Sequence, residues 1–223
     1  MPDAVMLFAA GFGTRMGALT ATRPKPMIEV AGRPLIDRAL EIARGVGPRR
    51  IVANLHYRGE AIAAHLRDTE VALSWEREAI LDTGGGLRAA LPLLGAGPVY
   101  TLNTDAVWCG PNPLAVLRGS WDAKRMEALL PCVPRVRALA HAGPGDFLVA
   151  PDGTATRGPG AVYSGAQIVA TDALDAIPET AFSLNRLWDG MIARGRLHAC
   201  LYPGLWCDVG RPDGIARAEA MLR

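Results

Sequence analysis

The first half of the chain alternates short apolar runs with segments that have the spacing of an amphipathic helix. The apolar runs span residues 5–10, 51–55, 71–75 and 99–103, and the helical segments span residues 34–44, 59–66 and 87–94. Apolar runs of four to eight residues are typical of buried strands, and regular alternation with helices is typical of parallel sheets. The alternation therefore predicts an α/β fold with a largely parallel sheet and helices on both of its faces.

The second half of the chain is less regular. Strands are expected at residues 128–133, 162–169 and 198–202, and helices at residues 183–194 and 212–223. Residues 142–160 are rich in Gly, Pro and Asp, which favours loops and hairpins. Because no repeat or low-complexity linker interrupts the chain, we expect one domain over residues 1–223.

Charge and cysteine content exclude several classes of protein. The 223 residues carry 24 Lys and Arg against 22 Asp and Glu, so no strongly basic surface is available for nucleic acid. The four cysteines form no C-x-x-C pair, which favours reduced thiols. The apolar run at residues 4–10 is far shorter than the roughly 20 residues of a membrane span. The start of the chain also lacks a basic signal-peptide region. We therefore expect a cytoplasmic protein with neither nucleic-acid nor membrane partners.

A glycine-rich loop follows the first predicted strand. Gly11, Gly13 and Gly17 depart from the dinucleotide motif G-x-G-x-x-G, because three residues separate the last two glycines. The loop also differs from the P-loop, since no Lys follows Gly17. The loop carries Arg15, and Lys25 lies just beyond it between two prolines that restrict the backbone. Glycines that admit close backbone approach, together with two cations, predict a phosphate-binding loop.

Two aspartates follow separate predicted strands. Asp105 comes directly after the run at residues 99–103, and Asp208 follows a short strand that ends near Trp206. Ligands of open α/β sheets bind at the carboxyl ends of the strands. Two such carboxylates suit Mg²⁺ when phosphates and water supply the other oxygens. A single Asp at a strand end is more often a turn or cap residue, and the spacing alone does not decide between the two interpretations.

Several segments together resemble the sugar-phosphate nucleotidyltransferase family. The resemblance rests on AAGFGTRM at 9–16, LT at 19–20, PKPM at 24–27, NTD at 103–105 and WCDVG at 206–210. It implies a Rossmann-like nucleotidyltransferase domain with a mixed, mostly parallel sheet and a smaller sugar-binding β-subregion. One departure is Arg211, which stands where relatives often have Thr. No counterpart of the second catalytic lysine of some members is evident.

The resemblance also implies roles for individual residues. Arg15 and Lys25 are implied to act in catalysis, and Asp105 and Asp208 to bind Mg²⁺. The implied nucleotide-binding residues are Ala10, Gly11, Gly13, Thr14, Arg15, Lys25, Glu78, Thr83, Gly84 and Asn103. The implied sugar-binding residues are Gly145, Asp146, Ser164 and Gly165. Asp82 or Thr83 is expected to cap the helix that begins in the glycine run at 84–86, and Trp188 is expected in the core.

The implied activity joins a nucleoside triphosphate to a sugar 1-phosphate and releases pyrophosphate. The short chain, the LDTGGG run at 81–86 and the GDF motif at 145–147 are most similar to members that use UTP and N-acetylmuramic acid 1-phosphate in peptidoglycan recycling. The alternatives are mannose 1-phosphate with GTP, glucose 1-phosphate with dTTP or UTP, and phosphocholine with CTP. A regulatory subunit on the same fold is a non-enzymatic alternative. A nicotinamide-dependent oxidoreductase is disfavoured by the spacing at Gly17.

Overall fold

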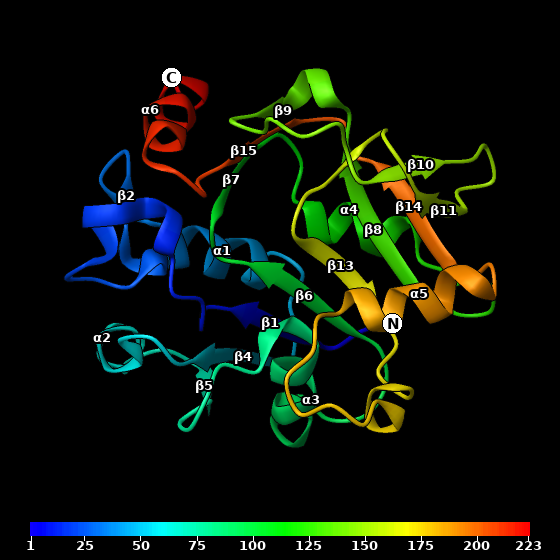
Figure 1. Cartoon of the computed structure of the whole chain (residues 1–223), viewed down its shortest axis with the longest axis horizontal. Coiled ribbons are helices and arrows are strands. Elements are labelled where there is room, and N and C mark those ends of the chain that lie inside the picture. The colour runs from blue at the N-terminus through cyan, green and yellow to red at the C-terminus, as the bar shows by residue number, and fades with distance from the viewer.

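A mixed eight-stranded sheet forms the centre of the computed structural model, which describes residues 1–223 (Figure 1). The strand order is β5, β4, β1, β6, β13, β8, and β12 and β14 also pair with β8. The first-half strands β1, β4, β5 and β6 are parallel, whereas β13 is antiparallel to both β6 and β8. The strands are β1 (Ala4–Phe8), β4 (Arg50–Leu55), β5 (Val71–Trp75), β6 (Val99–Asn103), β8 (Ala128–Val133), β12 (Val162–Tyr163), β13 (Ala166–Val169) and β14 (Leu197–Leu201).

Each face of this sheet has its own hydrophobic core. In β1, Ala4 and Met6 belong to one cluster of buried side chains, whereas Val5 and Leu7 belong to another. Side chains alternate between the two faces of a strand, so a strand covered on both sides reads as one continuous apolar run. The predicted apolar run at the start of the chain is therefore the signature of a central, doubly covered strand.

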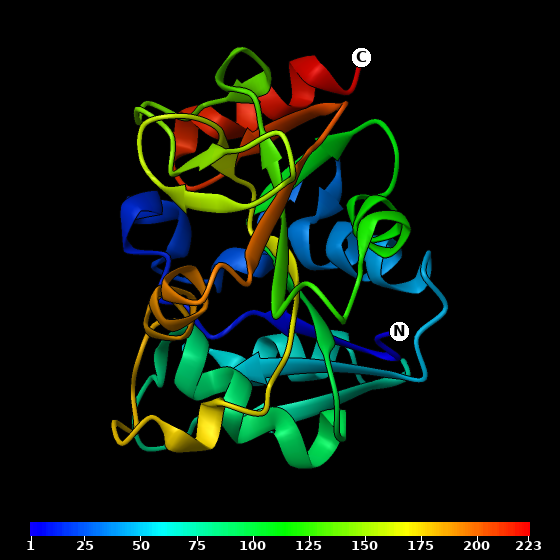
Figure 2. The ribbon, with the colours of Figure 1, turned by 90° about the vertical axis from the view of Figure 1, so that its right-hand side faces the viewer.

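Six α-helices surround the sheets, and five of them cover the faces of the central sheet. α1, α2 and α4 contribute buried residues to the cluster of Val5, and α3 and α5 to the cluster of Met6. Figure 2 shows α1 and α3 on opposite sides of the strands of the first half. The sixth helix, α6, packs elsewhere, against the strand that precedes Val209. The helices are α1 (Leu35–Arg44), α2 (Gly59–His65), α3 (Asp82–Leu94), α4 (Pro113–Ser120), α5 (Asn185–Ala193) and α6 (Pro212–Met221). No helix combines the length and the apolar character needed to cross a bilayer.

Smaller sheets and short 3-10 helices lie at the edges of the central sheet. The hairpin of β10 and β11 extends the second half of the molecule, and β7, β15 and β9 form a separate three-stranded sheet (Figure 1). The strands are β2 (Glu29–Val30), β3 (Arg33–Pro34), β7 (Ala106–Cys109), β9 (Ala138–Leu139), β10 (Phe147–Val149), β11 (Ala155–Arg157) and β15 (Leu205–Asp208). The 3-10 helices are η1 (Thr14–Thr20), η2 (Lys25–Met27), η3 (Arg135–Arg137) and η4 (Leu174–Ala176).

The structure corrects three details of the sequence-based assignment. The strand expected over 162–169 is split into β12 and β13 at Gly165, whose φ of +83° is incompatible with a continuous strand. Helix α3 begins at Asp82, just before the glycine run in which the helix was expected to begin, and Pro92 lies inside it instead of interrupting it. Helix α4 was not predicted. Its start is set by Asn112, whose side chain accepts hydrogen bonds from two backbone N–H groups of the first turn.

Candidate nucleotidyl-transfer site

The glycine-rich loop leaves the end of β1 and is fixed by its own residues. Gly13 has φ +65° and Gly17 has φ +56°, conformations that L side chains rarely adopt. The Thr20 hydroxyl lies 3.1 Å from the carbonyl oxygen of Gly13 and 3.2 Å from that of Gly17. Met16 is buried beneath the loop. The turn is thus held in place while Gly11 stays exposed, as a backbone that contacts a phosphate must be.

Lys25 is buried beside this loop. Its side chain emerges between Pro24 and Pro26 at the start of η2, and the residue is only 8% exposed. Its ammonium group donates a hydrogen bond to Asp105 Oδ2 at 2.8 Å. Lysine is rarely buried without an opposite charge, so this ion pair accounts for its position. A Cβ on Gly13 would lie 2.9 Å from Lys25 Cβ, which shows how closely the two segments approach.

A two-strand pairing brings the two predicted metal ligands together. β7 begins directly after Asp105, and β15 ends at Asp208, which lies opposite Ala106 in the antiparallel register. The N–H of Val209 donates to the carbonyl oxygen of Asp105 at 2.9 Å. Burial and, secondarily, the negative charge of Asp105 raise the pKa of Asp208 above its ordinary value. The two carboxylates therefore lie close enough for the charge of Asp105 to disfavour that of Asp208.

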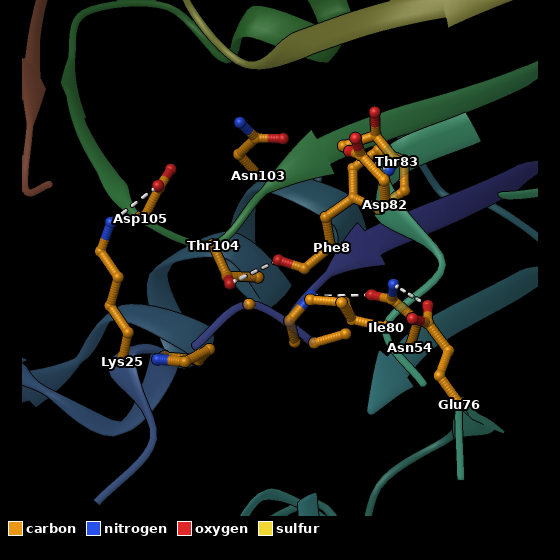
Figure 3. Close-up of a pocket in the computed structure, with 14 residues that line it drawn as sticks. Phe8, Lys25, Asn54, Glu76, Ile80, Asp82, Thr83, Asn103, Thr104 and Asp105 are labelled. Atoms are coloured by element: carbon orange, nitrogen blue, oxygen red, sulfur yellow. Dashed lines mark hydrogen bonds and ion pairs between the residues drawn. The ribbon is translucent and has the colours of Figure 1, made fainter. Parts of the chain in front are cut away.

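A cavity of about 200 Å³ opens beside Lys25 and Asp105 (Figure 3). It extends from the glycine-rich loop to the start of α3, across the carboxyl ends of the parallel strands. Five of the predicted nucleotide-binding residues line it: Ala10, Gly11, Lys25, Thr83 and Asn103. The other lining residues are Phe8, Ala9, Pro26, Asn54, Glu76, Ile80, Asp82, Thr104 and Asp105.

Asn54 and Glu76 line this cavity and were missed by the motif comparison. The Asn54 side chain accepts from the Ala9 N–H at 2.8 Å and donates to Glu76 Oε1 at 2.6 Å (Figure 3). Glu76 Oε2 accepts from the Leu81 N–H at 2.7 Å. Both side chains are buried, so these bonds join the first strand to the loop before α3. The sequence did contain a signal for both residues, because they are polar and lie at the ends of the predicted strands 51–55 and 71–75. Ligands of open α/β sheets bind at the carboxyl ends of the strands, which is the rule that identified Asp105.

Glu78, expected near the base, is exposed and does not line this cavity. Glu76 directly follows β5 and stays attached to the sheet, because its N–H donates to the Leu55 carbonyl at 2.9 Å. Glu78 lies beyond that hydrogen bond. The expected side-chain cap of α3 is also absent. The N–H groups of Gly84 and Gly85 donate to the Phe182 carbonyl at 2.8 and 3.1 Å instead. Gly84 is therefore buried against Phe182 and outside the cavity.

A second cavity, of about 330 Å³, adjoins the first. Phe8, Asp82, Thr83 and Asn103 line both cavities. The second one continues between the β10–β11 hairpin and α5, where its remaining lining residues are Asp146, Phe147, Arg157, Tyr163, Ser183, Leu184, Asn185 and Trp188. Trp188 is buried, as expected of a core residue, and its side chain also forms part of this wall.

Only one of the four predicted sugar-binding residues, Asp146, lines the second cavity. Ser164 is 1% exposed and its hydroxyl donates to the Pro131 carbonyl, so it supports the strand instead. Gly165 is buried, and a Cβ there would lie 2.8 Å from Asn103 Nδ2. Gly145 approaches Gly160 so closely that a Cβ would collide with its carbonyl oxygen. These three residues shape the region without reaching the cavity.

A third cavity, of about 390 Å³, lies on the other side of the carboxylate pair. Arg15 and Asp208 line it, together with His141, Arg211 and Arg217. Arg15 thus faces a different cavity from Lys25, and Gly13 and Thr14 connect the two positions along the loop. Arg211, which stands where relatives often have Thr, adds a second cation to the cavity that Arg15 lines. The spacing of the four histidines gave no indication that one of them, His141, lies here.

Curated relatives match nearly the whole chain. An N-acetylmuramate alpha-1-phosphate uridylyltransferase of Caulobacter vibrioides is 37% identical over 99% of this chain and 97% of its own length. A protein of the same name from Neisseria meningitidis serogroup B is 32% identical over 97% of this chain and 96% of its own length.

A solved structure supports the fold, and a family match supports the classification. HddC from Yersinia pseudotuberculosis, complexed with GMP-PN, superposes with a TM-score of 0.80 at 22% identity, and each chain is covered completely. Residues 5–199 match the family described as MobA-like NTP transferase domain. The site residues described above fall within this range, except for Asp208, Arg211 and Arg217, which follow β14. The chain belongs to the MobA-like NTP transferase domain family and is a nucleotidyltransferase.

Proposed function

We propose that this protein transfers the uridylyl group of UTP to N-acetylmuramic acid 1-phosphate, forming UDP-N-acetylmuramate and pyrophosphate. The observation that carries the proposal is the convergence of Lys25, Asp105 and Asp208 at one edge of the sheet, beside two adjoining cavities. The names of the two relatives, 37% and 32% identical over nearly their full lengths, supply the choice of substrates. A cytoplasmic role in peptidoglycan recycling follows from those substrates and stays a prediction.

The transfer needs no general base from the protein. A phosphate oxygen of the sugar 1-phosphate, already anionic, attacks the α-phosphorus of UTP. A new P–O bond forms on one side of that phosphorus. The bond to the β-phosphate oxygen breaks on the other side, and pyrophosphate leaves with the electron pair. Catalysis then consists mainly of positioning the reactants and neutralising the charge that they share.

We assign Lys25 and Arg15 to that neutralisation. Lys25 is held by two prolines and by Asp105, so its ammonium group is positioned before substrate binds. Arg15 faces the third cavity with Arg211 and Arg217, which suits the β- and γ-phosphates that leave as pyrophosphate. In the first cavity, Gly11 offers its backbone to the phosphates and Thr83 and Asn103 lie near the nucleoside. Asp146 lies in the second cavity, where we place the sugar.

The carboxylate pair fits Mg²⁺. Asp105 and Asp208 are hard oxygen donors, and their mutual repulsion would be relieved by a cation. No group of three or more His, Cys, Asp or Glu residues forms a cage, and Mg²⁺ usually takes its other ligands from phosphates and water. When bound, Mg²⁺ would supply Lewis-acid stabilisation of the phosphates. Lys25 would keep the Asp105 carboxylate oriented toward them.

The test is a matrix of donors and acceptors. UTP, dTTP, GTP and CTP are each combined with the 1-phosphates of N-acetylmuramic acid, N-acetylglucosamine, glucose and mannose, and with phosphocholine. Pyrophosphate release is measured with Mg²⁺ present, and products are identified by mass. The proposal expects the highest kcat/KM for UTP with N-acetylmuramic acid 1-phosphate. A clear preference for another pair would replace the substrate assignment, and no release with any pair would favour the regulatory-subunit alternative.

Metal dependence has its own test. Chelation should abolish pyrophosphate release, and added Mg²⁺ should restore it. Asp105→Asn and Asp208→Asn should each lower the rate by at least about 100-fold, the scale of losing one electrostatic contact to the transition state. Glu78→Gln is the matched control, because this exposed carboxylate lies outside the cavities and should leave the rate unchanged. Activity that survives the double aspartate substitution would refute the assignment.

A further inference from the structure

Arg157 is the one cation that lines the second cavity. The other charged residues there are Asp82 and Asp146, and the Asp146 carboxylate is already engaged by the Tyr163 N–H at 2.8 Å. A neutral sugar is recognised through hydrogen bonds to its hydroxyl groups, for which carboxylate and amide side chains suffice. A guanidinium in the wall indicates that an anionic substituent is recognised here.

The guanidinium of Arg157 is held against two aromatic rings. Its carbon lies 5.0 Å from the ring centroid of Phe147 and 5.5 Å from that of Trp188, both of which are buried. Those rings contact each other edge to face, with centroids 5.9 Å apart. A cation over such rings gains favourable electrostatic energy and loses much of its freedom to move. Arg157 is therefore fixed in orientation, as a residue that selects a ligand should be.

The hydrogen bonds of Arg157 leave part of its donor capacity unused. Nη2 donates to Asn185 Oδ1 at 2.8 Å and to Asp189 Oδ1 at 3.0 Å. Nε and Nη1 have no partner in the protein. These N–H groups point to different sides of the guanidinium, so each can donate a single charge-assisted hydrogen bond to an oxygen of a bound carboxylate. Asp189 is largely exposed, so it neutralises this cation only weakly.

The position of Arg157 separates it from the phosphates. Lys25 and Asp105 line only the first cavity, and Arg157 lines only the second, with Asn103 between them as a residue of both. A ligand whose 1-phosphate lies near Lys25 would thus present the far side of its sugar to Arg157. The guanidinium is therefore placed to bind a negatively charged substituent of the sugar ring, and it lies away from the 1-phosphate.

We propose that Arg157 is a specificity residue that binds the carboxylate of an acidic sugar substituent, the lactyl group in the case of N-acetylmuramic acid 1-phosphate. This inference rests on the proposed function. It adds that the enzyme distinguishes this substrate from N-acetylglucosamine 1-phosphate, which differs only in lacking the lactyl ether. The distinction is made by one charged contact, supported by Phe147, Trp188 and Asn185.

The test compares the two sugar phosphates in wild type, Arg157→Gln and Arg157→Lys. The glutamine variant should lose about 10- to 100-fold in kcat/KM for N-acetylmuramic acid 1-phosphate, mainly through KM, as expected for loss of a charged hydrogen bond. Its kcat/KM for N-acetylglucosamine 1-phosphate should stay within about threefold, and the lysine variant should be intermediate. Arg186→Gln is the matched control, since Arg186 lies on the same helix as Asn185, pairs with Glu179 and lines no part of this cavity. It should change neither value.

A substrate-side experiment leaves the protein intact. The methyl ester of the lactyl group removes the carboxylate charge, and wild type should lose activity on the ester to the same extent as Arg157→Gln loses it on the acid. Arg157→Gln should show no further loss on the ester. An equal loss on both natural sugars would mean that Arg157 only fixes the hairpin to α5, and it would overturn the inference while leaving the proposed function intact. Wild type inactive on N-acetylmuramic acid 1-phosphate would overturn both.

Discussion

Adding a single methyl group at Gly13 should test the close packing of the glycine-rich loop against Lys25. In Gly13→Ala the new Cβ would lie 2.9 Å from Lys25 Cβ and 3.0 Å from Thr20 Cγ2. Both distances are shorter than ordinary carbon contacts, so the Lys25 segment must shift. The two prolines beside Lys25 restrict the ways in which it can do so. The expected consequence is displacement of the ammonium group from its 2.8 Å contact with Asp105.

The magnitude follows from two contributions. Alanine at positive φ costs about 1–2 kcal/mol, partly offset by about 0.4–1 kcal/mol from the lower entropy of the unfolded chain, which leaves about 1 kcal/mol. Overpacking against Lys25 and Thr20 adds about 2 kcal/mol. A total of about 3 kcal/mol corresponds to a fall in Tm of about 9 °C for a domain of this size. We expect kcat to fall by at least about tenfold as well, because Lys25 loses its position.

Gly195→Ala provides the matched control. Gly195 has the same φ of +65° and follows α5, and a Cβ added there would meet no atom within 4 Å. It should lose only the conformational part, about 1 kcal/mol or about 3 °C, with unchanged kcat. Thermal unfolding of the ligand-free variants and steady-state pyrophosphate release measure both effects. Equal stability losses in the two variants, with full activity in Gly13→Ala, would refute the close contact between the loop and Lys25.

Three further outcomes are expected. Asp208→Asn should raise the Tm of the ligand-free protein, because it removes a half-buried charge beside a second carboxylate, while it lowers activity by at least about 100-fold. Glu76→Ala should cost about 2–4 kcal/mol in denaturant unfolding, since it leaves the Asn54 amide and a backbone N–H buried without partners; a loss below about 1 kcal/mol would contradict this network. The Arg44 side chain lowers the pKa of Glu70 to about 2 through its hydrogen bonds, so this pair stabilises the fold above pH 4.5 and loses its effect as the pH falls toward 2. Because both side chains are half exposed, Glu70→Gln should cost less than about 1 kcal/mol at about pH 7, and a constant difference down to about pH 2 would show that the charge is not responsible.

The alternating strands and helices of the first half of the fold could be predicted because each of them is specified locally. The run at 99–103 and the helix predicted over 34–44 depend on periodicity and on nearby glycines or prolines, and the predicted bounds of both are close to the observed ones. The division of 162–169 into two strands was not predictable from hydrophobicity, since nearly all of these residues face tightly packed neighbours. Only the positive φ of Gly165 reveals the break, and that angle accompanies its close contact with Asn103.

The candidate site shows the same division between local and long-range information. The loop residues and Lys25 are close in sequence, so the sequence motif alone was enough to predict that they lie together. Asn54 and Glu76 meet only because β4 and β5 are aligned with the end of β1. Glu78 was placed near the base by motif, yet the position two residues earlier is the one that the sheet directs into the cavity. Short glycine motifs such as Ser164-Gly165 are ambiguous, because the same residues can serve tight backbone packing.

The arrangement of charge explains why this site depends on the whole fold. Asp105 is paired with Lys25, whereas Asp208 keeps a raised pKa because it is partly buried near a second negative charge. The β7–β15 pairing holds the two carboxylates together against that repulsion, and the packing of α6 on β15 through Cys207 and Ala218 supports the pairing. Without ligand the repulsion reduces stability, and in the proposed function a cation and phosphates would turn it into part of the binding energy. The proposed reaction therefore depends on the elements that follow β14 as well as on the glycine-rich loop, although the two lie at opposite ends of the chain.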